Sequence, residues 1–238
     1  MSIKKEEDIQ KVKKDFEEYS NLILIQLKFL QKIIKSESNI VPDDIFKEIK
    51  KHEKEIDKFE VKVSEKVINT IVLHNPVASE LRQLMACYRM SVNMERIGDL
   101  VLNIVRYIKK IEDTKLYTDF IDAIDNILLS SIGMVEKALL SFANDDIEYA
   151  IWTIKNEEIV DELNHSFIKN VIKKTYPKEK SQAKLSTFLT MKSIVSNIER
   201  IADNATDIAE ATIYSLEGKD IRHKSIKKID KEIDNITS

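Results

Sequence analysis

The chain has very little glycine, proline and cysteine. Among its 238 residues, glycine and proline occur three times each and cysteine once, whereas glycine and proline together make up roughly 12% of an average protein. Sheets with tight turns and glycine-rich phosphate loops depend on these residues, which disfavours a β-sandwich, a β-barrel or a glycine-loop nucleotide fold. The lone Cys87 excludes an internal disulfide and a cysteine-rich zinc site, and we expect it to be a small core residue in a reducing compartment.

Long apolar runs are also missing. The most apolar short run, residues 22–25, is far below the roughly 20 residues that a membrane span needs. The charged start of the chain lacks the apolar segment of a secretory signal. The 38 basic and 41 acidic residues give a net charge of −3, so no nucleic-acid partner is expected. These absences predict a cytoplasmic protein.

The residues that are abundant favour an all-α fold of long amphipathic helices. Hydrophobic residues make up 43% of the chain and charged residues 33%; apolar residues recur at spacings of three and four, and no segment alternates with a period of two. Asn75 before Pro76 indicates a helix start, as does a capping box from Asp145 to Glu148, and Gly218 indicates a helix end. Six helices are expected, at residues 5–36, 43–74, 76–111, 118–142, 145–175 and 179–216.

The chain contains an internal duplication. A shift of 104 residues places Asn93–Ile104 on Asn197–Ile208 with six of twelve positions identical, and it places Phe16 on Phe120. Because the same shift works in all three helices of each half, the sequence predicts two homologous antiparallel three-helix bundles. The expected division is a first bundle at 1–112, a second bundle at 118–216 and a polar tail at 217–238, which we expect to be frayed or a solvated helix.

Each repeat carries two pairs of carboxylates at spacing i, i+4. This spacing places both members on one helix face, and counting outward from the turn near residue 75 brings the four carboxylates of the first repeat to one level of an antiparallel hairpin. Counting outward from the loop at 177–179 brings the four carboxylates of the second repeat to one level in nearly the same way. Converging carboxylates suit a hard metal ion, although salt bridges from Arg96 and Arg200 would give an ordinary charged surface. The eight residues are Glu53, Asp57, Glu95, Asp99, Glu157, Asp161, Glu199 and Asp203.

The sequence offers no catalytic machinery. The four histidines do not recur under the shift, and the Glu-x-x-His pattern of di-iron bundles occurs once, ending at His165, where two facing copies would be needed. No nucleophile triad or phosphate loop is present, so we do not expect an enzyme. Gly98 and Ala202 occupy equivalent positions between the carboxylates, which fits either the close approach of another helix or a tolerated small residue.

These residues resemble a known family, PhoU, the bacterial accessory regulators of phosphate transport. Glu95–Asp99 and Glu199–Asp203 are similar to its duplicated signature, Pro76–Arg82 to the segment that opens its third helix, and Ile213–Gly218 to its C-terminal end. The resemblance covers nearly the whole chain in family order. Three positions depart from the family pattern: Leu100 and Asn204 stand where the family often has His, and Asp207 where it usually has Asn.

The resemblance implies a fold, a metal site and a function. Members of the family fold as two three-helix bundles, commonly form homodimers and bind metal ions, including iron or zinc clusters, through motifs that fall here on the eight carboxylates. They restrain phosphate uptake and the phosphate-starvation response by contacting the ATPase subunit of the phosphate ABC transporter and a sensor histidine kinase. The chain would thus meet the membrane only through its partners. Two alternatives are a PhoU-like partner of a sodium–phosphate cotransporter and a metal-dependent helical-bundle enzyme.

Overall fold

The computed structural model describes residues 3–36, 40–175 and 181–222, and all regular structure in these ranges is helical. The six long helices that the sequence predicts are confirmed, and a short helix, α4, lies between the repeats. The helices are α1 (Ile3–Lys35), α2 (Asp43–His74), α3 (Ala78–Ile108), α4 (Thr114–Thr118), α5 (Ile121–Ala143), α6 (Ile147–Thr175) and α7 (Gln182–Glu217).

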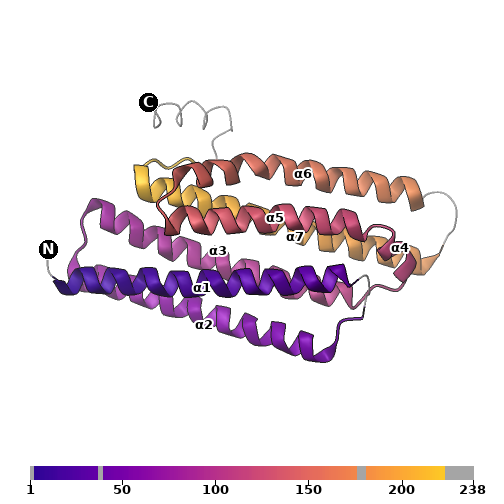
Figure 1. Ribbon diagram of the computed structural model, residues 1–238, viewed down its shortest axis with the longest axis horizontal. Coiled ribbons are helices and arrows are strands. Elements are labelled where there is room, and N and C mark those ends of the chain that lie inside the picture. Colours follow the sequence, from indigo (N-terminus) through magenta and orange to yellow (C-terminus); the bar gives the residue numbers. More distant parts are fainter. Residues whose placement is uncertain (1–2, 37–39, 176–180, 223–238) are drawn as a thin grey trace.

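The long helices form two three-helix bundles that pack against each other (Figure 1). Helices α1, α2 and α3 make the first bundle and α5, α6 and α7 the second, and α3 packs along α7 more extensively than any other two helices. The pair is antiparallel, because Arg82 near the start of α3 lies beside Gly218 at the end of α7, while Glu112 beyond α3 lies beside Thr187 near the start of α7.

The predicted apolar spacing becomes the core. Phe16, Ile23 and Leu27 of α1 are completely or almost completely buried, as are Met94 and Ile97 of α3. Cys87 is buried in the same core, which confirms its expected packing role, and burial raises the pKa of its thiol to about 12. A thiol held in this neutral form is a poor nucleophile.

Two of the predicted helix starts differ in detail. Asn75 ends α2 with a left-handed φ of 44°, and its N–H donates to Ile71 O; it is therefore a C-cap, and α3 begins after Pro76. Asp146 caps α6, because its Oδ1 accepts a hydrogen bond of 3.1 Å from Tyr149 N. The cap expected at Asp145 is therefore one residue early.

At the end of α7 the predicted helix boundary is confirmed, and at the start of α5 it is wrong. Gly218 ends α7 with a φ of 69°, which confirms the predicted stop. The helix expected from residue 118 begins instead at Ile121, because residues 114–118 form α4, whose first turn is capped by Asp113.

The connection between the repeats is tied to the second bundle. Thr187 Oγ1 of α7 accepts hydrogen bonds from Glu112 N at 3.2 Å and Asp113 N at 2.9 Å, and Leu116 and Tyr117 of α4 are buried. The expected domain division falls in this segment. The expectation for the tail lies largely outside the described residues, which end at Arg222; before that end, Ile221 is buried.

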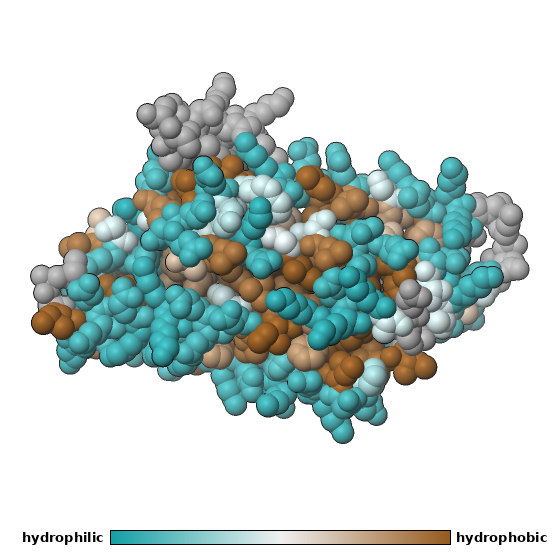
Figure 2. All heavy atoms as spheres, in the orientation of Figure 1, coloured by the Kyte–Doolittle hydropathy of each residue, from teal (hydrophilic) through white to brown (hydrophobic). Residues whose placement is uncertain are grey.

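One helix in the described part of the chain, α5, is long and apolar enough to cross a membrane by length and composition alone. Half of its apolar stretch is buried inside the molecule, and core helices of soluble proteins pass the same test. The face that carries α1 and α5 is mostly hydrophilic with scattered hydrophobic residues (Figure 2). The burial of α5 between its neighbours accounts for its apolar character.

Candidate metal centre

The two helical hairpins α2–α3 and α6–α7 carry the eight predicted carboxylates. We call Glu53, Asp57, Glu95 and Asp99 the first acidic group. The pKa of Glu53 is raised by burial first and then by the negative charges of Asp57 and Asp99. Since Asp99 belongs to α3, the two helices present these side chains to each other at one level, as counting from the turn predicts.

Glu95, on the opposite helix α3, is also partly buried and is also repelled by other carboxylates of the first acidic group. Burial raises the pKa of Glu95, and the charges of Asp99 and Asp57 raise it further. Glu60, one turn beyond Asp57, adds to this effect. The first group therefore holds its negative charge under mutual repulsion.

Glu157, Asp161, Glu199 and Asp203 form the second acidic group, which has more extensive mutual repulsion. Burial is the largest cause that raises the pKa of Asp203 to about 6, followed by the charges of Glu157, Glu199 and Asp161. The pKa of Glu157 is also raised, by burial and then by neighbouring carboxylates that include Asp161. The duplication thus reproduces the arrangement in both hairpins.

Glu199 of the second acidic group has an amide and an imidazole as polar neighbours. Asn164 Nδ2 donates a hydrogen bond to Glu199 Oε2, and the charge of His165 partly offsets the burial and the Asp161 charge that raise the pKa of Glu199. His165 is exposed and its Nδ1 lies 2.8 Å from Asp161 O. Its placement beside the group was not predicted, because His165 has no counterpart in the first repeat.

Gly98 explains how α2 and α3 come close enough to oppose their carboxylates. A Cβ at Gly98 would lie 3.0 Å from both Cδ1 and Cγ2 of Ile56, and Gln26 Nε2 of α1 donates to Gly98 O at 3.3 Å. The close helix approach that the small residue suggests is therefore present. Ile56 lies on α2 between Glu53 and Asp57.

Salt bridges from arginines to these groups are not seen in the described part of the chain. Neither Arg96 nor Arg200 forms an ion pair with the eight carboxylates among the described residues, although the charge of Arg96 slightly opposes the raised pKa of Glu95. The alternative of salt-bridged helix faces therefore has little support from the geometry. The charges of Arg106 and Arg96 offset the raised pKa values of Glu53 and Glu95 only in part.

The donor chemistry of the two groups fits a hard metal ion, because each group offers several carboxylates at one level with raised pKa values. Their positions are not those of a closed site: among the described residues, no three Asp, Glu, His or Cys side chains are arranged to hold a metal ion. Metal ligation by the eight residues therefore stays a prediction.

Glu210 is a residue of this face that the sequence did not single out. Its pKa is raised to about 7, by burial first and then by Asp207 and Glu157, while Arg89 of α3 opposes the shift. Glu210 lies seven residues after Asp203 and so shares its helix face. That spacing is the signal that could have identified it.

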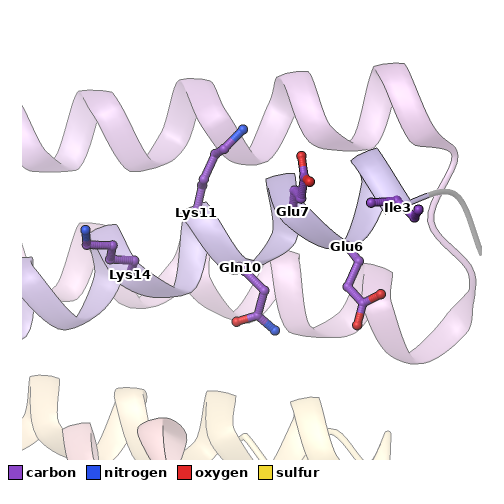
Figure 3. A pocket seen from close by; sticks show the side chains of 6 residues that line it. All are labelled: Ile3, Glu6, Glu7, Gln10, Lys11 and Lys14. Atoms are coloured by element: carbon purple, nitrogen blue, oxygen red, sulfur yellow. The ribbon is translucent and has the colours of Figure 1, made fainter.

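A surface hollow away from the acidic groups lies along the start of α1 and is lined by Ile3, Glu6, Glu7, Gln10, Lys11 and Lys14 (Figure 3). All six residues belong to a single helix, so the hollow has no opposing wall to enclose a ligand.

Comparison with known proteins places both repeats in one family. The family model of the PhoU domain matches residues 16–108 and again residues 124–212. The chain belongs to the PhoU family. Its two domain matches end at positions related by the 104-residue shift, which agrees with the duplication seen in the sequence.

Individual PhoU proteins show the same relationship. The chain is 31% identical over 186 residues, 77% of its length and 78% of the relative's, to a phosphate-specific transport system accessory protein PhoU homolog from a Burkholderia species. It is 27% identical over 188 residues, 79% of its length and 76% of the relative's, to the accessory protein PhoU of Escherichia coli K12.

A solved structure shows the same fold. The crystal structure of PhoU from Pseudomonas aeruginosa covers 90% of this chain and 99% of its own, with a TM-score of 0.79 and 20% sequence identity. The Burkholderia and Escherichia coli relatives are named as accessory proteins of a phosphate-specific transport system. This chain therefore belongs to a family of transport accessory proteins with an all-α fold of two three-helix repeats.

Proposed function

We propose that this PhoU protein is a cytoplasmic negative regulator of phosphate uptake and of the phosphate-starvation response. The observation that carries the proposal is the match of both repeats, residues 16–108 and 124–212, to the PhoU domain, together with relatives named as accessory proteins of phosphate transport. Its partners would be the ATPase subunit of the phosphate ABC transporter and a phosphate-sensing histidine kinase, and it would act as a homodimer.

The two acidic groups supply the proposed metal sites of this regulator. A bound iron, zinc or other divalent ion would neutralise the repulsion within each group and link two helices of a hairpin. Glu53 and Asp57 would contribute from α2, and Glu95 and Asp99 from α3. The second acidic group would act in the same way between α6 and α7. The two hairpins would hold the carboxylates of each group at one level, where a single ion can contact several of them.

The regulatory role can be tested in cells. The chain is expressed in a bacterium that lacks its own PhoU gene and carries a reporter of the phosphate-starvation response. In high phosphate, the reporter and the rate of phosphate uptake should both fall towards wild-type levels. An unchanged reporter and an unchanged uptake rate, with the protein present and folded, would contradict the proposal.

A binding experiment identifies the partner. Purified PhoU protein should bind the ATPase subunit and the kinase of its own organism on an immobilised-protein sensor. Binding to a sodium–phosphate cotransporter, without binding to the ABC system, would favour the cotransporter alternative instead. Turnover of phosphate esters or of an oxidisable substrate by the metal-loaded protein would show that the chain is an enzyme and contradict an accessory role.

A further inference from the structure

Helix α2 lies at one edge of the molecule (Figure 1), where it packs against α1 and α3. Its buried residues Ile49, Ile56 and Val63 belong to the core. The opposite side of the helix carries exposed positions at spacings of four and three residues, which places them in one line along the helix. We call these positions the α2 outer line: Lys47, Lys51, Lys54, Lys58, Val61, Glu65, Ile68 and Val72.

The first half of the α2 outer line consists of four lysines. Lys51 Nζ lies 3.9 Å from Glu55 Oε1, which is a weak contact at a protein surface. Among the residues that the structure describes, the other three lysines of this half form no ion pair. Residues of both signs flank the line, Lys50 and Lys62 as well as Glu48 and Glu55. The lysines of the line therefore decide the sign of this surface.

The second half of the α2 outer line is mainly aliphatic. Val61 and Ile68 are each 52% exposed and Val72 is 70% exposed, and Glu65 is the one acidic residue of the line. Beyond Val72, the turn to α3 adds Val77, which is 64% exposed. Aliphatic side chains gathered at exposed positions are a feature of interaction sites.

The second repeat does not reproduce the lysine run. Under the 104-residue shift, Glu158 and Glu162 of α6 stand where α2 has Lys54 and Lys58, so the positive charge is interrupted there. The helical scaffold is common to both repeats, whereas the run of four lysines belongs to one of them. The needs of the shared scaffold therefore do not account for the lysines.

The chemistry of the α2 outer line suits a lipid surface better than another helix. A helix packed along the line would bury the lysines, and the desolvation of buried charges can exceed what their pairing returns. Two α2 helices from two copies would set lysines against lysines if parallel, and against the aliphatic half if antiparallel. At an anionic bilayer, the ammonium groups stay hydrated among the headgroups while aliphatic side chains enter the headgroup boundary.

We infer that the α2 outer line docks the protein on an anionic lipid bilayer, with α2 lying along the membrane surface. The line spans about 38 Å from Lys47 to Val72, so the contact is long. Its lysines supply attraction to anionic headgroups, and its aliphatic half supplies apolar contact. The sequence led us to expect that the chain meets the membrane only through its partners, and this line adds a direct contact. The inference does not depend on metal binding or on the proposed regulatory function.

Vesicle flotation of the full-length protein tests the lysine half. The probes are vesicles of phosphatidylcholine alone and vesicles of phosphatidylcholine and phosphatidylglycerol in equal parts. We expect the wild type to float with the anionic vesicles and not with the neutral ones, and high salt should weaken the binding. An α2 lysine variant should bind the anionic vesicles at least about tenfold more weakly. This variant carries Lys47→Gln, Lys51→Gln, Lys54→Gln and Lys58→Gln.

A matched variant removes the same charge from exposed lysines outside the line and should float like the wild type. It carries Lys28→Gln, Lys169→Gln, Lys173→Gln and Lys192→Gln. An equal loss in both variants would show that only net charge matters and would overturn the inference. A wild type that ignores anionic vesicles, or that floats equally well with neutral ones, would also overturn it. If the α2 lysine variant floats normally but no longer binds the ATPase subunit, the line contacts a protein and the inference is wrong.

The duplication supplies a local reporter for the aliphatic half. Ile68 and Ile172 are equivalent under the 104-residue shift and are 52% and 49% exposed. Ile68→Cys and Ile172→Cys are made separately and labelled with an environment-sensitive fluorophore, while the buried Cys87 should stay unlabelled. On anionic vesicles, the emission of labelled Ile68→Cys should shift to the blue and that of labelled Ile172→Cys should not. Equal shifts at both positions, or no shift in Ile68→Cys, would overturn docking through α2.

Discussion

Gly98 of α3 and Ile56 of α2 are packed so closely that a further carbon atom has no free space between them. A Cβ on Gly98 would lie 3.0 Å from two carbon atoms of Ile56, and Ile56 is itself completely buried. One of the two atoms is Cγ2, which is fixed by the branched Cβ and cannot rotate away alone. The contact lies between the carboxylates of the first acidic group, so it sets how near the two acidic helices approach.

This contact predicts the effect of Gly98→Ala. Alanine in a helix is favoured over glycine by about 1 kcal/mol, whereas overpacking a well-filled core costs about 1–3 kcal/mol. We expect overpacking to dominate, so that the free energy of unfolding falls by about 1 kcal/mol in a denaturant titration.

Gly133 provides the control for Gly98. It also lies inside a helix, α5, but a Cβ there would meet no atom within 4 Å. Gly133→Ala should therefore raise the free energy of unfolding by up to about 1 kcal/mol. If both substitutions stabilise the protein to the same extent, Ile56 moves aside freely and the close approach has no structural importance.

The helices and the two acidic groups could be predicted because their signals are local. Apolar spacing locates each helix, and the opposition of Glu53 to Asp99 follows from counting residues on either side of one turn. Details that depend on backbone conformation were less predictable. Asn75 belongs to a residue type that favours both helix N-caps and the left-handed C-cap conformation, so the sequence could not show which role it takes.

Contacts between the repeats were not predictable from spacing at all. Glu210 is influenced by Arg89, which lies on a different helix of the other repeat, and Thr187 accepts hydrogen bonds from the segment between the repeats. These relationships depend on how α3 packs along α7. An internal duplication indicates that two similar units exist and does not determine the register between them.

Thr187→Ala should weaken the attachment of this connecting segment to α7. The completely buried hydroxyl of Thr187 accepts from two backbone N–H groups, of Glu112 and Asp113, and its removal leaves both without this acceptor. Glu112 is exposed and Asp113 half-buried, so water can partly replace the lost acceptor, and we expect a loss of about 1 kcal/mol in thermal or denaturant unfolding. Thr187→Ser keeps the hydroxyl and should recover most of the lost stability. A Ser variant as unstable as the Ala variant would assign the loss to the methyl group instead.

The raised pKa of Glu210 predicts how the stability of the fold changes with pH. Its pKa in the folded chain is about 7, above the ordinary 4.5, so the folded state binds more protons than the unfolded state between these values. The free energy of unfolding therefore decreases as the pH rises from about 4.5 to 7. Glu210→Gln removes this ionisation and should raise stability at about pH 8 by about 1–2 kcal/mol relative to about pH 5, after a discount for partial exposure.

The control for this measurement is Glu158→Gln, which changes an exposed glutamate of α6. Its stability should follow the wild-type pH curve. The measurement is the denaturation midpoint at a series of pH values in the presence of a chelator, so that bound metal does not compensate the charge. If stability depends on pH in the same way in Glu210→Gln and in the wild type, the fold does not raise the pKa of Glu210.

The last prediction concerns the metal role of the acidic groups. A ligand that binds only the folded state raises its stability by RT ln(1 + [L]/Kd), which is about 2.7 kcal/mol at a hundredfold excess over Kd. Wild-type protein stripped of metal should therefore melt at a higher temperature when Mn²⁺, Fe²⁺ or Zn²⁺ is added. Asp99→Asn with Asp203→Asn keeps the side-chain shape but removes a charge from each acidic group, and the metal-dependent rise should be lost. Without metal, the same variant should melt slightly above the wild type, because the substitutions relieve like-charge repulsion.

The duplication sharpens this test, since each repeat should hold its own metal. Asp99→Asn alone should halve the bound metal measured by native mass spectrometry, and Asp203→Asn alone should remove the other half. As a matched control, Glu17→Gln with Glu158→Gln removes two exposed carboxylates outside both acidic groups and should leave the metal content unchanged. If the wild type and the Asp99→Asn, Asp203→Asn variant are stabilised equally, the metal binds elsewhere. If the wild type shows no rise at all, the acidic groups are charged surfaces whose repulsion the fold tolerates without a metal.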